Sequence, residues 1–104
     1  MNGFVVTVDF RLKRGAKAAF GKLIDENAQM SCERQPGCGR FAVLLSKGAN
    51  DRIFLYEIYD GRTAFDTHLQ SPHFTTFNKT SADLIMNRKV AEFDLIFEGQ
   101  NNRR

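Results

Sequence analysis

Six polar residues of this sequence have the types and spacing to carry out acid–base chemistry. They are Asn27, Ser31, Glu57, Tyr59, His68 and His73. A carboxylate beside an imidazole forms a usable pair, because burial raises the pKa of the carboxyl group and lowers that of the imidazole, while proximity does the opposite. Either outcome allows proton transfer near neutral pH. Glu57 and His68 are therefore the candidate catalytic residues, and the other four are candidates for contacting a substrate.

Each of these residues also has a purely structural interpretation. Glu57 could form a salt bridge with Arg40 on the adjacent strand, and Arg40 could instead bind a substrate phosphate if it reaches the cavity. His68 could be a hydrogen-bonded core histidine, and His73, directly after Pro72, could face solvent in a first helical turn. The remaining three could be ordinary core or helix-end residues. The hypothesis of a site therefore depends on the convergence of all these groups.

The hydrophobic pattern predicts the elements that position these residues. Alternating apolar residues predict four strands, with expected ranges 4–12, 38–46, 52–60 and 90–97. Helical spacing predicts a long helix over residues 16–34 and two shorter helices after the third strand. Thr63 is expected to cap the first short helix, and Ser71 and Pro72 are expected to begin the second as N-cap and first residue. The buried stripe of the second is expected to contain Phe74, Phe77, Leu84 and Ile85.

The order β-α-β-β-α-β predicts an α+β, ferredoxin-like sandwich, with a four-stranded antiparallel sheet and helices on one face. Both alternating sets of the third strand contain apolar residues, which is not expected when one sheet face is in water. A homodimer packed through the open face of the sheet would cover it. If the helices cover the face of Glu57 and Tyr59, the six residues converge between helices and sheet. We expect one domain over residues 1–98 and a polar tail over residues 99–104.

Composition and charge limit the kinds of molecule that the protein is expected to bind. The chain has 104 residues, a net charge of +3, 42% hydrophobic residues and 26% charged residues, as is typical of a small globular domain. Its basic residues gather near the first turn and at the end of the chain. They form no stripe interleaved with aromatic residues, so nucleic-acid binding is not expected. The sequence also shows no signal peptide and no apolar run long enough to span a membrane.

The two cysteines, Cys32 and Cys38, are too few for a disulfide framework. We therefore expect reduced thiols and a cytoplasmic location. Their spacing is not that of a zinc site, and the two histidines lie far along the chain, so no metal is expected. Cys32 is also expected near a helix C-terminus, the wrong end for stabilising a nucleophilic thiolate.

Short motifs spread over nearly the whole chain form a recognisable series. They are Glu26-Asn27-Ala28, Ser31, Pro36-Gly37-Cys38, Arg40-Phe41, Leu55-Tyr56-Glu57-Ile58-Tyr59, Ala64-Phe65, His68 and Ser71-Pro72-His73-Phe74. The series resembles the antibiotic biosynthesis monooxygenase domain superfamily. Within it, the sequence looks most like the quinol monooxygenase branch that includes the autoinducer-2 phosphate-processing enzyme. The order and spacing of these motifs are specific for fold, but they are poorly specific for reaction.

The resemblance implies a dimeric α/β barrel-type assembly with one pocket per subunit between sheet and helices. It also implies a monooxygenase that oxidises a small quinol-like or enolisable compound with molecular oxygen and uses no metal or flavin cofactor. The protein would bind and deprotonate this substrate in a dry cavity. His68 or Glu57 would be the base. The residues that the resemblance places in the pocket are Asn27, Ser31, Glu57, Tyr59, His68 and His73.

The resemblance leaves the reaction open. An isomerase or degrading enzyme for a small carbonyl compound, phosphorylated or not, would need the same acid–base groups. A non-catalytic dimeric binding module would use the same fold. Haem-degrading relatives carry a Trp on the third strand and a haem-ligating His in the second helical segment. Here those positions correspond to Tyr59 and Asn78, so no haem is expected.

Overall fold

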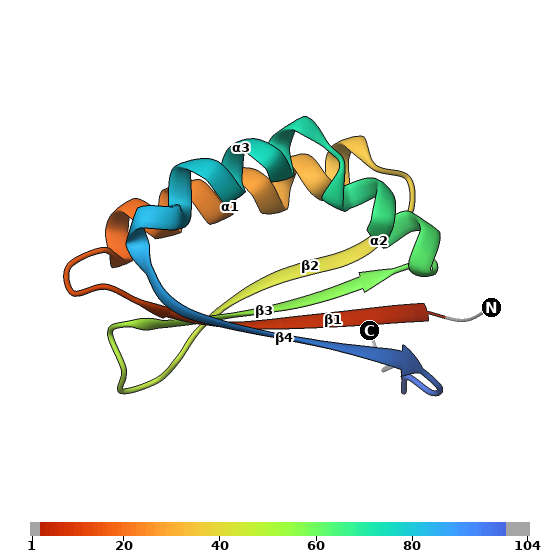
Figure 1. Ribbon diagram of the computed structural model, residues 1–104. Coiled ribbons are helices and arrows are strands. Elements are labelled where there is room, and N and C mark those ends of the chain that lie inside the picture. The colour runs from red at the N-terminus through yellow and green to blue at the C-terminus, as the bar shows by residue number, and fades with distance from the viewer. Residues whose placement is uncertain (1–2, 100–104) are drawn as a thin grey trace, which may run out of the picture.

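The computed structural model describes residues 3–99, which form a four-stranded antiparallel sheet with helices on one face (Figure 1). The strands lie in the order β2-β3-β1-β4. Their bounds are β1 Gly3–Leu12, β2 Cys38–Leu45, β3 Arg52–Tyr59 and β4 Ile85–Leu95. The helices are α1 Lys17–Arg34, α2 Arg62–Leu69, α3 Pro72–Ser81 and the 3-10 helix η1 Ala82–Leu84. This arrangement confirms the predicted ferredoxin-like α+β fold. No helix among the described residues is both long and apolar enough to cross a membrane.

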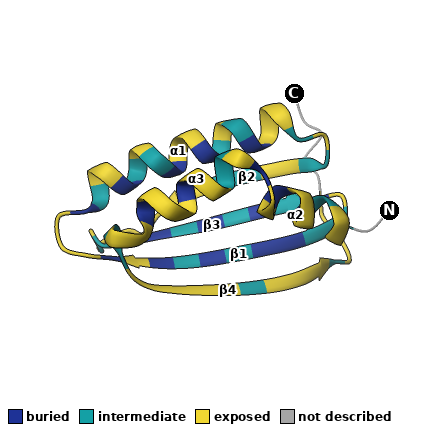
Figure 2. Cartoon of the chain, turned by 45° about the horizontal axis from the view of Figure 1, so that its top comes forward, coloured by how far each residue is buried: buried dark blue, intermediate teal, exposed yellow. Residues whose placement is uncertain are grey.

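The hydrophobic core lies between the helices and the sheet. In β3 the buried residues alternate with half-buried ones, as expected of a strand whose two faces differ (Figure 2). Phe10 of β1, Phe20 of α1 and Phe77 of α3 pack together, with ring centroids 4.9 Å apart for Phe10 and Phe20 and 5.6 Å apart for Phe20 and Phe77. These rings join both long helices to the sheet at the C-terminal half of β1. Glu57 lies opposite Val6, nearer the other end of the sheet.

Two predicted features of the last part of the chain were wrong. The last strand begins at Ile85 and not at residue 90, because Leu12 of β1 already pairs with Ile85. Leu84 therefore belongs to η1, and Ile85 belongs to the strand instead of a helical stripe. The strand ends at Leu95, before the predicted end at residue 97. Most of the polar tail predicted over residues 99–104 lies outside the described residues.

The two short helices begin in different ways. Ser71 caps α3 as predicted: its Oγ accepts a hydrogen bond of 3.2 Å from the backbone N–H of Phe74, and Pro72 is the first helical residue. The prediction that Thr63 caps α2 was wrong, because the residue at the N-cap is Gly61 and no side chain caps this end. Thr63 lies inside the helix, where its carbonyl oxygen accepts a hydrogen bond from Thr67 Oγ1.

The central part of the sheet face opposite the helices is apolar, and no described helix or loop covers this face (Figure 1). Val5 lies at its centre, paired with Ile58 on one side and with Phe93 on the other. Val5 is buried by these neighbours, while the Phe93 side chain is 51% exposed. Leu44 on β2 is another large exposed side chain of this face, because its cross-strand partner is Phe54.

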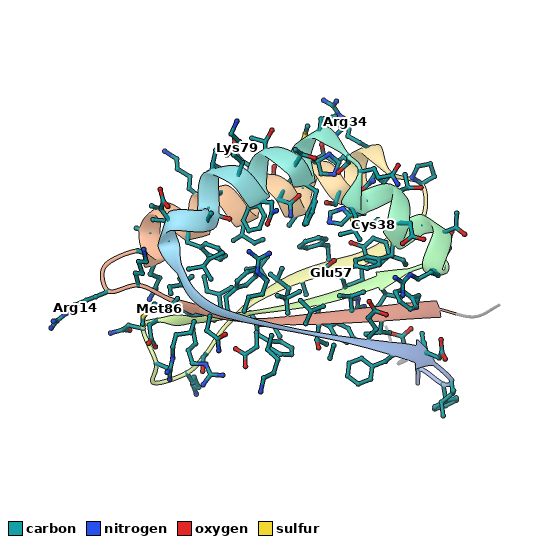
Figure 3. All side chains as sticks on the ribbon, viewed as in Figure 1. Arg14, Arg34, Cys38, Glu57, Lys79 and Met86 are labelled. Atoms are coloured by element: carbon teal, nitrogen blue, oxygen red, sulfur yellow. A yellow bond between two sulfur atoms is a disulfide. The ribbon has the colours of Figure 1, made fainter. Side chains whose placement is uncertain are left out.

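Cys32 and Cys38 form a disulfide, so the prediction of two reduced thiols was wrong (Figure 3). Their Cα atoms are 5.1 Å apart across the turn that joins α1 to β2, a separation typical of disulfides. The turn is closed by a 3.0 Å hydrogen bond from the N–H of Cys38 to the carbonyl oxygen of Gln35. Reasoning from cysteine count and zinc spacing missed this pairing, because a single local bridge requires neither a framework nor a motif. The disulfide links the last turn of α1 to the start of β2, where Cys38 pairs with Tyr59 of β3.

Candidate functional site

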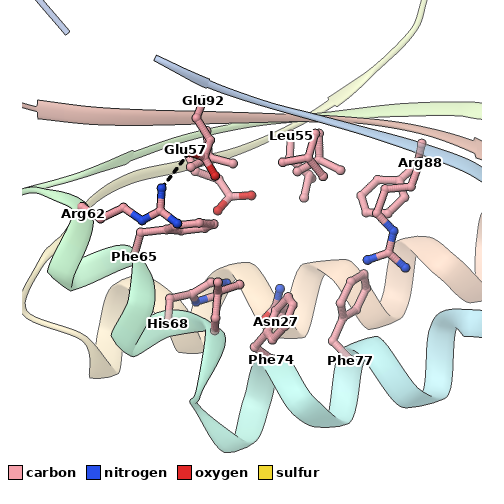
Figure 4. Close-up of a pocket in the computed structure, with 15 residues that line it drawn as sticks. Asn27, Leu55, Glu57, Arg62, Phe65, His68, Phe74, Phe77, Arg88 and Glu92 are labelled. Atoms are coloured by element: carbon pink, nitrogen blue, oxygen red, sulfur yellow. Dashed lines mark hydrogen bonds and ion pairs between the residues drawn. The ribbon is translucent and has the colours of Figure 1, made fainter. Parts of the chain in front are cut away.

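A cavity of about 270 Å³ lies between the sheet and the helices (Figure 4). Most of its wall is apolar, and the polar side chains that line it are Asn27, Glu57, Arg62, His68, Arg88 and Glu92. Its volume is just below the usual range of about 300–1,000 Å³ for small-molecule pockets, which suits a compound of one or two rings. Nowhere in residues 3–99 do three or more His, Cys, Asp or Glu side chains come together as metal ligands would.

Glu57 projects from β3 toward the helices and is only 3% exposed. Burial raises the pKa of Glu57 to about 7, and a hydrogen bond from the Tyr59 hydroxyl partly opposes this shift. That hydroxyl donates to Glu57 Oε1 over 2.6 Å. Burial, together with the charge of Glu57, raises the pKa of Tyr59 above its usual range, so the phenol stays protonated. Glu57 can therefore gain or lose a proton near neutral pH while Tyr59 holds one of its oxygens.

His68 on α2 is fixed by hydrogen bonds to its Nδ1. This atom lies 3.3 Å from Ser31 Oγ and 3.0 Å from Gln35 Oε1. Ser31 already donates its hydroxyl proton to the carbonyl oxygen of Asn27 over 2.6 Å, and Gln35 Oε1 can only accept. Nδ1 must therefore be the donor, which leaves the lone pair of the imidazole on Nε2.

Burial also keeps His68 neutral. The side chain is 2% exposed, and burial lowers the pKa of His68 to about 4, with a further contribution from the charge of His73. Aromatic rings surround the imidazole: the Phe74, Tyr59 and Phe41 centroids lie 5.1, 5.6 and 5.9 Å from its own. A neutral, tightly held imidazole can accept a hydrogen bond from a ligand through Nε2, but it is a weak base.

Asn27 contributes a buried amide to the wall of the cavity. It is 3% exposed, and its Oδ1 has no hydrogen-bond partner among the described residues. Buried carbonyl oxygens are usually paired, because leaving one unpaired costs free energy. A hydroxyl group of a bound molecule could supply the missing donor.

Five of the residues predicted from sequence lie in two layers around the cavity. Asn27, Glu57 and His68 line it directly. Ser31 and Tyr59 lie behind them, each hydrogen-bonded to a lining residue. Helix α1 buries Asn27 and Ser31 on the same face as its apolar residues, which is the position that helical spacing predicts.

The other two predicted residues do not line the cavity. His73 is half-buried in a neighbouring groove, where its Nε2 lies 3.3 Å from Gln35 Oε1 and its ring centroid lies 5.7 Å from that of His68. Burial and the charge of Arg34 lower the pKa of His73. Arg40 is exposed and lies opposite Ile58 on the open face of the sheet. No ion pair between Arg40 and Glu57 occurs in the described part of the chain.

Sequence reasoning missed four polar residues at or beside the cavity. They are Gln35, Arg62, Arg88 and Glu92. The early start of β4 explains why Arg88 was missed. Residues 88, 90 and 92 pair with Phe10, Val8 and Val6 of β1, whose side chains face the helices. The predicted strand begins only at residue 90, so the first polar residues of β4 fall outside it. Gln35 was read only as the residue at which the long helix ends.

Comparison with known proteins identifies close structural similarity. A family model described as antibiotic biosynthesis monooxygenase matches residues 3–80. A solved structure described as a "putative antibiotic biosynthesis monooxygenase" from Nitrosomonas europaea is 29% identical, with a TM-score of 0.87 and 91% of each chain covered.

Two more distant structures with the same description share the fold. The one from Bacteroides thetaiotaomicron has a TM-score of 0.89 at 17% identity, covering 98% of this chain and 97% of the other. The one from Caulobacter crescentus has a TM-score of 0.87 at 16% identity, covering 92% of each chain. Among curated proteins, none matches the chain. The family match includes Asn27, Glu57 and His68, and it ends before Arg88.

Proposed function

Because the chain belongs to the antibiotic biosynthesis monooxygenase family, we propose that it is a cofactor-independent oxygenase of a small quinol-like or enolisable compound. The observation that carries the proposal is the state of Glu57. Its carboxyl group is buried in the wall of an apolar cavity, where its pKa is raised to about 7. A base with that pKa is well matched to removing a weakly acidic proton at neutral pH.

Glu57 acts as the general base in this proposal. Tyr59 holds Oε1, so Oε2 remains to take the proton of a substrate hydroxyl. His68, with its pKa lowered to about 4, is the weaker base, and it orients the substrate by accepting a hydrogen bond at Nε2. Asn27 Oδ1 accepts from another substrate group. The aromatic wall excludes water around the resulting anion.

Deprotonation makes the substrate electron-rich enough to reduce molecular oxygen itself. For a hydroquinone, one oxygen atom forms a bond to a ring carbon and the other leaves as water. The organic product is a hydroxyquinone, and the four electrons that the substrate loses are those that the oxygen molecule gains. The proton taken up by Glu57 leaves with the water, which returns the carboxylate to its starting state.

The same pair of groups supports a second reaction, proton transfer next to a carbonyl group. Glu57 would remove the proton from carbon, and a neutral imidazole with a protonated Nδ1 and a free Nε2 would orient the carbonyl compound through its hydroxyl groups. This isomerase-type reaction consumes no oxygen. It would instead exchange substrate hydrogen for deuterium in D2O.

Oxygen uptake with a panel of hydroquinones tests the proposed oxygenase. We expect uptake above the uncatalysed rate, and a fall of about a hundredfold or more in Glu57→Gln, as is usual when a general base is lost. Glu98→Gln is the matched control, because Glu98 is exposed and lies beyond β4. Equal uptake by wild type and Glu57→Gln would overturn the proposal. Deuterium exchange without oxygen uptake would favour the isomerase.

We also propose that the protein is a homodimer. The open face of the sheet carries exposed apolar side chains, including Leu44 and Phe93. Val5 lies on the same face and is buried. An apolar face of this kind is typical of a surface that packs against another. A second copy of the chain would present the same face, as a two-fold interface requires.

A further inference from the structure

The cavity has two polar ends. Glu57 and Glu92 both lie opposite Val6 at one end, while Arg88 lies opposite Phe10 at the other. The backbone positions of Arg88 and Glu92 are separated by about 13 Å along β4, given the usual rise per strand residue. The two side chains reach into the same cavity from these positions. A molecule that binds at both ends would therefore carry a separate polar group for each end.

Both ends carry an arginine, but only one of the two is paired with carboxylates. Arg62 forms ion pairs of 2.7 Å with Glu92 and 3.3 Å with Asp66. Arg88 instead donates from Nη1 to the neutral side chain of Asn78 over 3.1 Å. Within residues 3–99, no carboxylate lies within ion-pair distance of Arg88. The positive charge of Arg88 at the cavity wall is therefore not compensated by an ion pair.

Arg88 is exposed and lines the cavity. Its hydrogen bond to Asn78 runs from the edge strand β4 to helix α3, and its guanidinium carbon lies 5.5 Å from the centre of the Phe10 ring. Figure 4 shows the guanidinium turned toward Phe77. One of its donors is used by Asn78, and a guanidinium has five. The others can form the paired hydrogen bonds that match a carboxylate or a phosphate.

We propose that Arg88 binds an anionic group of the substrate, while the reactive ring lies against Glu57 and His68. The substrate class is thus a quinol-like or enolisable ring with a carboxylate or phosphate on a short side chain. The part concerning the ring rests on the proposed function. The part concerning the anion depends only on the position and the uncompensated charge of Arg88.

Binding measured without oxygen tests this proposal. The probes are 3-(2,5-dihydroxyphenyl)propanoate, its neutral amide, and 2-(2,5-dihydroxyphenyl)ethyl phosphate, titrated calorimetrically into the full chain. We expect the wild type to bind at least one anionic probe about ten- to a hundredfold more tightly than the amide, as a charge-assisted hydrogen bond would give. The tighter of the two anions identifies the group.

Two variants decide whether Arg88 causes the preference. Arg88→Gln is expected to bind the anions no more tightly than the amide, with its affinity for the amide unchanged. Lys89→Gln removes the same charge one residue away, but Lys89 lies opposite Asp9 on the other sheet face, so the preference should remain. A preference that survives in Arg88→Gln, or an equal loss of affinity for amide and anions, would overturn the proposal.

Failure of this proposal is distinguishable from failure of the proposed oxygenase. A wild type that oxidises neutral hydroquinones but shows no preference for the anions would overturn the anion site alone. A wild type that prefers the anions, loses that preference in Arg88→Gln and consumes no oxygen would support the anion site and overturn the oxygenase.

Discussion

Burial shifts the pKa values of two residues of the site in opposite directions. Burial raises the pKa of Glu57 from 4.5 to about 7, and it lowers the pKa of His68 from 6.5 to about 4. Between about pH 4 and about pH 7, both side chains are therefore neutral in the folded protein. In the unfolded chain, at least one of them is charged over this pH range. This difference makes the folding stability depend on pH, and the signs differ for the two groups.

We predict opposite pH dependences of stability in two single variants. The contribution of Glu57 to the free energy of unfolding is fully present below pH 4.5 and is lost as the pH rises through about 7. The contribution of His68 is fully present above pH 6.5 and is lost as the pH falls through about 4. These slopes offset each other in the wild type between pH 4.5 and 6.5. His68→Asn removes the contribution of His68, so its stability relative to the wild type should fall with rising pH. Glu57→Gln removes the contribution of Glu57, so its stability relative to the wild type should rise with rising pH. Each change should reach up to about 3 kcal/mol.

Urea unfolding at intervals of half a pH unit measures these slopes. The other carboxylates titrate in all three proteins, so only differences from the wild type are compared. His68→Asn keeps an N–H donor near Gln35, which limits the loss of structure. Stability curves of both variants that run parallel to the wild-type curve would show that neither group is shifted by burial.

At the scale of elements, the disulfide is one of the features that sequence reasoning predicted wrongly. It closes a loop between the end of α1, which carries Ser31, and the start of β2. A loop this short gives a stabilisation of about 2 kcal/mol in the chain-entropy description. The bridge therefore supports the turn that presents Gln35 to His68.

We predict that the Cys32→Ser, Cys38→Ser double variant unfolds with a free energy about 2 kcal/mol lower than the oxidised wild type. A phosphine reductant should lower the stability of the wild type by a similar amount and leave the double variant unchanged. Urea unfolding with and without reductant measures both effects. A wild type that is indifferent to the reductant would show that the bridge does not contribute to stability.

Local sequence patterns predicted most of the elements, because most are encoded by periodicity and caps. The Ser71-Pro72 start of α3 and the alternation of β3 are signals of this kind. The start of β4 could not be predicted in this way. Asn87, Arg88 and Lys89 are tolerated there because an edge strand accepts charged residues, and the strand is defined by its pairing with β1.

The residues of the candidate site can also be divided into those that local sequence patterns predict and those that only tertiary pairing reveals. Glu57, His68 and Asn27 were predicted because polar residues interrupt faces that are otherwise apolar. Arg88 lies on a strand segment that the pattern did not reveal, so its place at the cavity depends on tertiary pairing. Arg40 shows the reverse error. Its place on the strand next to that of Glu57 suggested a contact, but the alternation of side chains along β2 puts it on the other face of the sheet.

For the whole molecule, the proposed dimer is the feature with the clearest test. We expect sedimentation at micromolar concentration to give twice the mass of the 11.8 kDa chain. Phe93→Asp should shift the protein toward the monomer, because it replaces an exposed apolar side chain of the proposed interface with a charge. Val43→Asp, on the face toward the helices, is the matched control and should leave the dimer intact. A monomeric wild type would contradict the proposal.

The central claim is that Glu57, with a pKa of about 7, is the base of an oxygen-consuming reaction. The most direct test is the pH profile of oxygen uptake with hydroquinone between pH 5 and 9, after subtraction of the uncatalysed rate. We predict that kcat/KM of the wild type rises with pH through an apparent pKa near that of Glu57 and then levels off, because the carboxylate form is the active one. Glu57→Gln should lose both the activity and this transition. An unchanged profile in Glu57→Gln would contradict the account.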